Sequence, residues 1–397
     1  MSVLFSPFEL RGLKIRNRFI HSATFESMAL DTGEVTDQII KRYRRLARGE
    51  VGLIIPGYMY IHPYGKGALN QMGIHSDAMI PGLQGLVEAI HEEGSKVVFQ
   101  LHHAGRQTSK NFSGRHPKGP SSEGRDPMLL IKPKVMTEME IIEVIESFGN
   151  AAERAVKAGA DGVQIHAAHG YLVNQFLSPF FNKRNDEWGG SDEKRFRFLK
   201  EVIMAIRNKI PEEMPLMIKL NTNDFTPKKG ITPELAVKYT EWLANLEIDL
   251  IEVSCGSMFY SSFNTMRGDV PVKTLLNFYP WWMKPLANLV LKSKSGKFNL
   301  EEGYNLDAAK MIRGKSGDVA LSVVGGFRKL KHMEEVVEEG YSDFISLSRP
   351  FIREPYIVKK FKEGKKEEVD CKSCNECLGN VINSRPLRCY SNGESED

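Results

Sequence analysis

Eight short apolar segments, separated by amphipathic stretches, recur along the chain, and this alternation constrains the fold most strongly. The predicted strands span residues 18–24, 51–58, 96–101, 163–166, 216–221, 249–254, 320–324 and 343–347. The predicted helices span residues 37–47, 82–91, 141–157, 193–209, 233–245 and 330–339. Strands separated by single helices form parallel βαβ units, and eight strands favour a closed (β/α)8 TIM barrel over an open sheet. An open doubly wound sheet would favour an early GxGxxG turn, and the sequence has none.

Two long irregular segments interrupt this pattern, at residues 103–134 after the third strand and at 256–305 after the sixth. Excursions of this length in a compact domain are usually functional, and both follow strand ends on the face where barrel enzymes act. The second insertion holds Met258, Phe259, Tyr260, Phe278, Tyr279, Trp281 and Trp282. We expect these aromatic side chains to pack inside a small helical subdomain rather than touch a membrane, because large aromatics are normally buried.

The distribution of charged residues along the chain argues against a nucleic-acid partner. The chain has 397 residues, and its 54 basic and 50 acidic side chains give a net charge of +4 and are interspersed. Such a surface indicates no nucleic-acid partner. No apolar run approaches the roughly 20 residues of a membrane helix, and the N-terminus lacks the features of a secretion signal. We therefore predict a cytoplasmic protein without a membrane span.

Residues 164–171 run from a predicted strand into a loop at Gly170 and have the layout of an active site. His166, His169 and Tyr171 lie close together there, and imidazole and phenol groups are common proton donors and acceptors in catalysis. The alternative is a metal-dependent barrel hydrolase with His166 and His169 as ligands. Zinc would need a third ligand, for which His102 and His103 are the nearest candidates.

Four further strand ends carry groups that suit a flat, phosphorylated cofactor. Gly326 follows the seventh strand and Arg349 the eighth, where barrels commonly bind phosphate; the alternative is a tight turn with a surface arginine. Gln100 and Lys219 end the third and fifth strands and can contact the edge of a heterocycle.

The motifs together resemble the old yellow enzyme family of NADH:flavin oxidoreductases over residues 3 to 360. The matching segments are residues 17–19, 100–106, 166–171, 177–197, 325–327 and 348–350. The cysteines after the barrel make the chain most similar to the barrel domain of the 2,4-dienoyl-CoA reductase and enoate reductase branch.

The resemblance implies bound FMN. The residues it places at the flavin ring are Ala23, Thr24, Gly57 and Gln100, with Lys219 near flavin N1 and O2. The residues it places at the phosphate are Gly325, Gly326, Ser348 and Arg349.

The resemblance also implies an FMN-dependent ene-reductase that is reduced by NADH or NADPH and then reduces the C=C bond of an α,β-unsaturated carbonyl compound. His166 and His169 would bind the carbonyl oxygen of this small-molecule enone, and Tyr171 would protonate its α-carbon. The alternatives are a flavin-dependent NAD(P)H oxidase, quinone reductase or nitro reductase on the same site. An oligomer is compatible with this reading.

The C-terminal cysteines mark a second region. Cys371, Cys374, Cys377 and Cys389 have a spacing compatible with a [4Fe–4S] cluster or a four-cysteine zinc site, and reduced thiols are the alternative. We predict an FMN-binding barrel over residues 1–365 and a cysteine-rich extension over 366–397. Because Arg349 precedes the extension, the FMN site is expected to lie entirely within the barrel.

Overall fold

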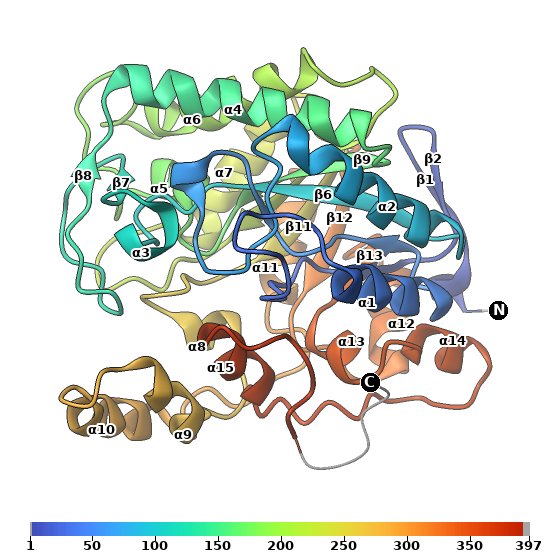
Figure 1. Cartoon of the computed structure of the whole chain (residues 1–397). Coiled ribbons are helices and arrows are strands. Elements are labelled where there is room, and N and C mark those ends of the chain that lie inside the picture. Colours follow the sequence, from blue (N-terminus) through green and yellow to red (C-terminus); the bar gives the residue numbers. More distant parts are fainter. Residues whose placement is uncertain (1, 392–397) are drawn as a thin grey trace.

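The structure, a computed structural model, describes residues 2–391 and contains the predicted barrel (Figure 1). Its eight strands are β3 (Phe19–His21), β4 (Leu53–Ile54), β6 (Lys96–His102), β9 (Gly162–Ala167), β10 (Leu216–Asn221), β11 (Leu250–Ser254), β12 (Ala320–Val324) and β13 (Phe344–Leu347). They are all parallel in the order β4-β3-β13-β12-β11-β10-β9-β6, and pairing of β4 with β6 closes the barrel. The short β5 (Met59–Tyr60) pairs with the end of β6. Each predicted strand is found, and the (β/α)8 prediction is confirmed.

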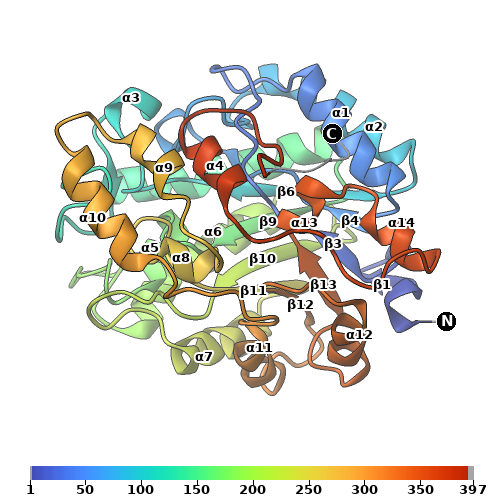
Figure 2. The same ribbon diagram turned by 90° about the horizontal axis from the view of Figure 1, so that it is seen from below.

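Helices surround the barrel, as Figure 2 shows. They are α1 (Asp37–Arg48), α2 (Ile80–His91), α4 (Glu138–Lys157), α6 (Asp192–Arg207), α7 (Pro233–Leu243), α11 (Leu306–Arg313), α12 (Leu330–Glu338), α13 (Arg349–Arg353) and α14 (Ile357–Lys362). The start of α4 is a capping box, in which the Thr137 hydroxyl accepts from the Glu140 amide and the Glu140 carboxylate accepts from the Thr137 amide. The Ser191 and Thr232 hydroxyls cap α6 and α7 by accepting from the Lys194 and Leu235 amides.

The barrel interior changes from apolar to polar along the strands. Side chains alternate between the two faces of a strand, so every second residue points inward. The lower layer is an apolar cluster that includes Ile20, Val98, Met217, Leu250 and Phe344. A hairpin of β1 (Phe8–Leu10) and β2 (Leu13–Ile15) packs against this cluster. Two residues further along the strands, the interior layer is polar and holds Ser22, Gln100, Gln164, Lys219, Glu252, Ser322 and Ser346.

The insertion after β11 forms α8 (Ser262–Thr265), α9 (Val272–Leu275) and α10 (Lys284–Lys294). The prediction that its aromatics pack inside a subdomain is wrong for two of them, because Trp281 is 82% exposed and Trp282 is 63% exposed. Figure 2 shows α9 and α10 at the periphery of the molecule. The short connection before α10 leaves the two indoles without a facing layer.

The cysteine-rich segment packs back onto the barrel through α15 (Glu376–Ile382), which lies against α9. Leu387 and Val381 form an apolar cluster with Ile352, and the Leu387 amide donates to the Glu26 carbonyl over 2.8 Å. None of the helices in residues 2–391 is long and apolar enough to cross a membrane.

Candidate active site

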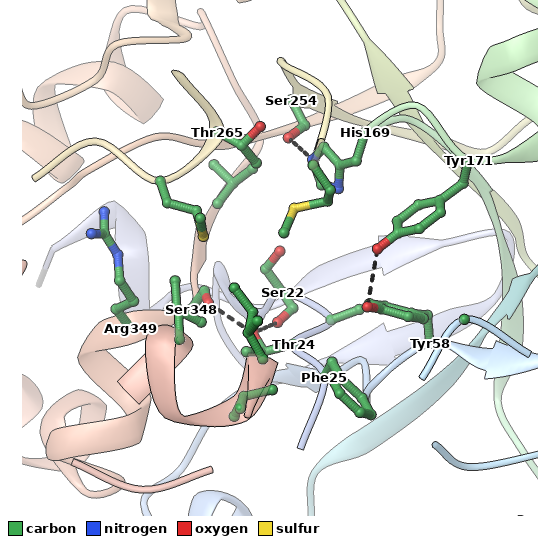
Figure 3. A pocket seen from close by; sticks show the side chains of 18 of the residues that line it. Ser22, Thr24, Phe25, Tyr58, His169, Tyr171, Ser254, Thr265, Ser348 and Arg349 are labelled. Carbon is green, nitrogen blue, oxygen red and sulfur yellow. Dashed lines mark hydrogen bonds between the residues drawn. The ribbon is translucent and has the colours of Figure 1, made fainter. Parts of the chain in front are cut away.

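A cavity of about 240 Å³ lies at the carboxyl ends of the barrel strands (Figure 3). Eight of the twelve residues predicted for catalysis or FMN binding line it, namely Ala23, Thr24, His169, Tyr171, Lys219, Gly326, Ser348 and Arg349. Figure 3 shows Arg349 and Ser348 at one end, with Tyr58 and Tyr171 at the other. One end of the cavity is therefore cationic, and the opposite end carries phenol and imidazole groups.

The cationic end is built by two buried arginines, Arg349 and Arg328. Arg349 donates to the Arg267 carbonyl over 2.7 Å and to Asn375 Oδ1 over 2.6 Å. Arg328 donates to the Cys371 carbonyl over 3.1 Å, and burial lowers its pKa. Among the described residues, neither guanidinium has a carboxylate partner. Buried cations without a counter-ion favour an anionic ligand such as a phosphate.

Backbone geometry at this end also suits close approach of a ligand. Gly326 has a φ of +75°, a left-handed conformation that favours glycine, and a Cβ there would lie 2.7 Å from the Glu301 carbonyl oxygen. The Thr24 and Ser348 hydroxyls are 2.7 Å apart and join the ends of β3 and β13. These contacts hold the two strand ends at the cavity in one arrangement.

A buried ion pair lies below the middle of the cavity. Lys219 Nζ is 3.3 Å from Glu252 Oε1 and donates to Ser22 Oγ over 2.7 Å, and both charged side chains are at least 98% buried. Gln164 donates to Glu252 Oε2 over 3.0 Å and accepts from Gln100 Nε2 over 2.6 Å. The carboxylate is thus held between a lysine and an amide, and the lysine faces the cavity.

The opposite end of the cavity is formed by the loop after β9. His169 has a φ of +61°, and its Nε2 lies 2.7 Å from Ser254 Oγ, which fixes the ring. Tyr171 Oη lies 3.1 Å from Tyr58 Oη. Gly170, which lies between His169 and Tyr171, has no room for a side chain, because a Cβ would lie 2.5 Å from Ser257 Oγ.

The protonation states of these groups follow from burial. Burial, followed by the positive charge of Lys219, holds the pKa of His169 well below its ordinary value. Burial raises the pKa of Tyr171 to about 12, although its hydrogen bond with Tyr58 acts in the opposite direction. His169 is therefore neutral and Tyr171 protonated at neutral pH, so both can donate hydrogen bonds.

Four predicted residues do not line the cavity, namely Gly57, Gln100, Gly325 and His166. The Gly57 amide donates to Glu26 Oε1 over 2.7 Å, and its neighbour Tyr58 lines the cavity instead. Gln100 lies in the polar layer below, with its Oε1 buried and without a hydrogen-bond partner in the described structure. His166 is buried behind His169, with ring centroids 5.1 Å apart.

Several residues that line the cavity were not predicted from the sequence. Tyr58 is the last residue of the strand predicted over residues 51–58, and Arg328 lies two residues after the Gly-Gly turn at a predicted phosphate site, so their positions gave a usable signal. No local pattern indicated the C-terminal contribution, in which Leu378, Val381 and Ile382 also line the cavity. The cavity therefore extends beyond residues 1–365, the range to which the sequence assigned FMN binding, and that assignment stays a prediction.

The four cysteines line a second, small cavity of about 20 Å³ beside Arg349, and all four are free. Within residues 2–391, no three His, Cys, Asp or Glu side chains come together in an arrangement that could hold one metal ion. This arrangement gives no support to a zinc site at the cysteines. It likewise gives His166 and His169 no third ligand for a hydrolase metal.

Comparison with known proteins assigns the class of this barrel. A model of the NADH:flavin oxidoreductase / NADH oxidase family matches residues 3–286. NADH oxidase of Thermoanaerobacter brockii is 33% identical over 394 residues, which cover 98% of this chain and 56% of that protein. NADPH dehydrogenase of Geobacillus sp. (strain WCH70) is 34% identical over 357 residues, which cover 89% of this chain and 92% of that protein.

Solved structures agree with this assignment. A complex of 2-naphthoyl-CoA reductase with 2-naphthoyl-CoA matches at a TM-score of 0.85 and 26% identity, over 98% of this chain and 56% of the other. The old yellow enzyme homologue from Zymomonas mobilis matches at a TM-score of 0.74 and 25% identity, over 98% and 97% of the two chains.

The chain belongs to the NADH:flavin oxidoreductase family. Membership confirms the predicted resemblance to this family, for which FMN is the expected flavin. The chain spans only about half the length of the Thermoanaerobacter brockii NADH oxidase and of the metal reductase of Desulforamulus reducens, at 56% and 54%.

Proposed function

We propose that this chain is an FMN-dependent ene-reductase, which takes electrons from NADH or NADPH and reduces the activated C=C bond of an α,β-unsaturated carbonyl compound. The observation that carries this proposal is the arrangement of His169 and Tyr171 across the cavity from Arg349. Hydrogen-bond donors and a protonated phenol lie at one end of the cavity, and buried cations lie at the other.

The lining residues fit FMN in two respects. Arg328 and Arg349 would hold the phosphate beside Gly326, where the backbone permits close approach. Lys219 would face the electron-rich edge of the ring, where its charge favours the anionic reduced form. When bound, FMN supplies hydride transfer between the nicotinamide and the acceptor.

The protein's own groups would act on the acceptor. His169, fixed by Ser254, would donate to the carbonyl oxygen and stabilise the negative charge that develops there. His166 would support the same oxygen after a small ring movement, because its Nδ1 has no hydrogen-bond partner in the described structure. Tyr171 would deliver a proton to the α-carbon, with Tyr58 orienting its hydroxyl.

The test is a His166→Ala, His169→Ala double variant. We expect at least about a hundredfold slower reoxidation of the reduced flavin by an enone, which corresponds to roughly 2.7 kcal/mol of lost oxyanion stabilisation. Reduction of the flavin by the nicotinamide should change much less. An unchanged enone rate would contradict the proposed roles.

The competing function is an NAD(P)H oxidase, quinone reductase or nitro reductase at the same site. The NADH oxidase of Thermoanaerobacter brockii supports this alternative. Steady-state turnover with an enone, a quinone, a nitroarene and oxygen separates the candidates. If quinone or oxygen turnover exceeds enone turnover by about a hundredfold or more, the ene-reductase proposal fails.

The C-terminal cysteines are proposed, separately, as ligands of a [4Fe–4S] cluster. The support is that Cys371, Cys374, Cys377 and Cys389 line one cavity beside Arg349. Iron and sulfide analysis after anaerobic purification is the test, and less than about a tenth of an equivalent of cluster would leave the cysteines as free thiols.

A further inference from the structure

The insertion after β11 carries an apolar surface that faces solvent. Among the described residues, thirteen large hydrophobic side chains are exposed, and five of these fall between residues 281 and 290. The five, here called the tryptophan patch, are Trp281, Trp282, Leu286, Leu289 and Val290, with exposures of 82%, 63%, 65%, 68% and 45%. A concentration of this kind marks an interaction site, whereas isolated exposed apolar residues do not.

The patch follows helical geometry. Leu286, Leu289 and Val290 are spaced three and four residues apart and therefore share one face of α10. Ala287 and Leu291 of the same helix are buried and attach it to the insertion. Figure 1 shows α10 at the edge of the molecule, away from the helices that surround the barrel. The helix thus has one apolar face toward the protein and another toward solvent.

The charged side chains in the segment that carries the tryptophan patch are all positive. Residues 270–300 contain five lysines and no aspartate or glutamate. None of these lysines forms an ion pair with a described residue, and Lys284, Lys292 and Lys297 are exposed. The neighbouring Glu301 is paired with Arg267, and Asp269 lies just before the segment. Free cations around exposed indoles complement an anionic, partly apolar surface.

We propose that the tryptophan patch docks this protein peripherally onto a membrane containing anionic lipids. Tryptophan and leucine insert at the boundary between headgroups and acyl chains, and lysines are attracted to anionic headgroups. A folded protein partner would also bury the leucines, but it gives no particular reason for an acid-free segment of five lysines. The proposal does not depend on the identity of the electron acceptor.

Docking would also place the cavity near the lipid surface. Phe278 lines the cavity and lies three residues before Trp281 on the same insertion. An acceptor dissolved in the bilayer would therefore reach the site over a short distance. The insertion would then help the acceptor to reach the cavity, in addition to attaching the protein to the membrane.

The experiment uses the full chain with FMN and two kinds of vesicle, phosphatidylcholine alone and phosphatidylcholine with about 30% phosphatidylglycerol. We expect at least about fivefold more protein to sediment with the anionic vesicles, and salt at about 0.5 M should reduce this binding. The indole emission should shift to shorter wavelength on binding, because Trp281 and Trp282 leave water.

A triple variant, Trp281→Ser, Trp282→Ser and Leu286→Ser, should lose about tenfold or more of the vesicle binding while it retains the circular dichroism and nicotinamide-dependent flavin reduction of the wild type. The matched control is Met139→Ser with Ile142→Ser, which removes exposed apolar side chains from α4 and should bind vesicles normally.

Three results would overturn the proposal: no preference for anionic vesicles, equal binding by the triple variant, or equal loss in the control. A dimer that the triple variant dissociates, without vesicle binding, would instead identify the patch as a contact between two copies of the chain.

Discussion

Arg349, which faces the cavity, donates to Asn375 Oδ1 over 2.6 Å, and Asn375 lies between the second and third cysteines of the C-terminal segment. The Asn375 amide in turn donates to the Met266 and Asp269 carbonyls, over 2.8 Å and 2.9 Å. One buried side chain therefore joins the proposed phosphate site, the cysteine segment and the insertion. This relationship makes the C-terminal segment part of the proposed cofactor site.

The first prediction concerns retention of FMN. Arg349→Ala should weaken FMN binding by more than about tenfold, because a charge-assisted hydrogen bond contributes on the order of 1.5–3 kcal/mol. Asn375→Gly removes only the side chain and keeps the left-handed backbone, at a φ of +59°. It should accelerate FMN release by several-fold, roughly the effect of one buried hydrogen bond.

Flavin fluorescence during dialysis measures both effects. Asn383→Ala is the matched control, because Asn383 donates to carbonyls of Thr274 and Gly379 in the same region and does not contact Arg349. Normal FMN retention by Asn375→Gly would show that Asn375 does not hold Arg349 in its binding position.

The second prediction concerns the buried Lys219 and Glu252 pair. Glu252→Gln keeps the shape of the side chain and an acceptor for Gln164, but removes the negative charge beside Lys219. The lysine charge would then act on the flavin without compensation and favour the anionic reduced form. We expect the two-electron midpoint potential to rise by about 30–60 mV, where 30 mV corresponds to about 1.4 kcal/mol.

Anaerobic photoreduction against a reference dye measures this potential. Ser322→Ala is a suitable control, because Ser322 neighbours Glu252 in the barrel register and is uncharged. Its potential should stay within about 10 mV of the wild type. A potential that falls or does not change in Glu252→Gln would refute the electrostatic role of the carboxylate.

The sequence predicted the barrel well because the relevant signal is local. Alternation of strand-like and helical segments fixes the eight strands, and the strand ends bring Lys219, Gly326 and Arg349 to one face whatever the details of packing. No helix was predicted at α11, because Leu306–Arg313 follows a long irregular insertion whose end has no clear signal.

The missed features depend on contacts between distant parts of the chain. The link between Arg349 and Asn375 and the cavity wall formed by Val381 arise from the path of the C-terminal segment, which no periodicity encodes. The exposure of Trp281 was missed for the same reason, because burial of an aromatic depends on what packs over it. Local patterns thus locate strand ends, whereas long-range packing decides what lies between them.

The third prediction concerns Tyr171. Tyr171→Phe should slow enone reduction by about 10²- to 10⁴-fold, as expected for loss of one general acid, and should leave flavin reduction by the nicotinamide nearly unchanged. Because burial raises the pKa of Tyr171 to about 12, the wild-type phenol should remain protonated, and the enone rate should not fall between about pH 6 and pH 10 through loss of this proton.

Stopped-flow reoxidation with an enone and with a quinone is the measurement. Tyr58→Phe serves as the comparison, because it removes the hydroxyl that contacts Tyr171 without removing the acid itself, and its effect should be smaller. An equal loss with both acceptors in Tyr171→Phe would count against proton delivery to carbon.

The last prediction concerns stability in acid. Among the described residues, His21, His102, His103 and His166 are buried and His169 is partly buried at the cavity. Desolvation is the main cause that lowers the pKa of all five, to about 3 for His21 and His103 and well below the ordinary value for His102, His166 and His169. In the unfolded chain each should titrate near 6.5, so below that pH the unfolded state binds more protons than the folded state. Above about pH 6.5 these histidines are neutral in both states and do not reduce stability. As the pH falls from about 6.5 toward the folded pKa, protonation of the unfolded chain progressively lowers the free energy of unfolding.

Each of these histidines should lower the free energy of unfolding by up to about 1.4 kcal/mol per pH unit below 6.5. Urea unfolding at about pH 7.5, 6.5 and 5.5, compared between wild type and His103→Asn, isolates one of them, since asparagine can still accept from the Gly105 amide. The stability of the variant should fall less steeply with acid, by about 1.4 kcal/mol per pH unit, whereas His116→Asn, at an exposed position, should follow the wild type. If His103→Asn has the same pH dependence as the wild type, His103 gains a proton as readily in the folded protein as in the unfolded chain.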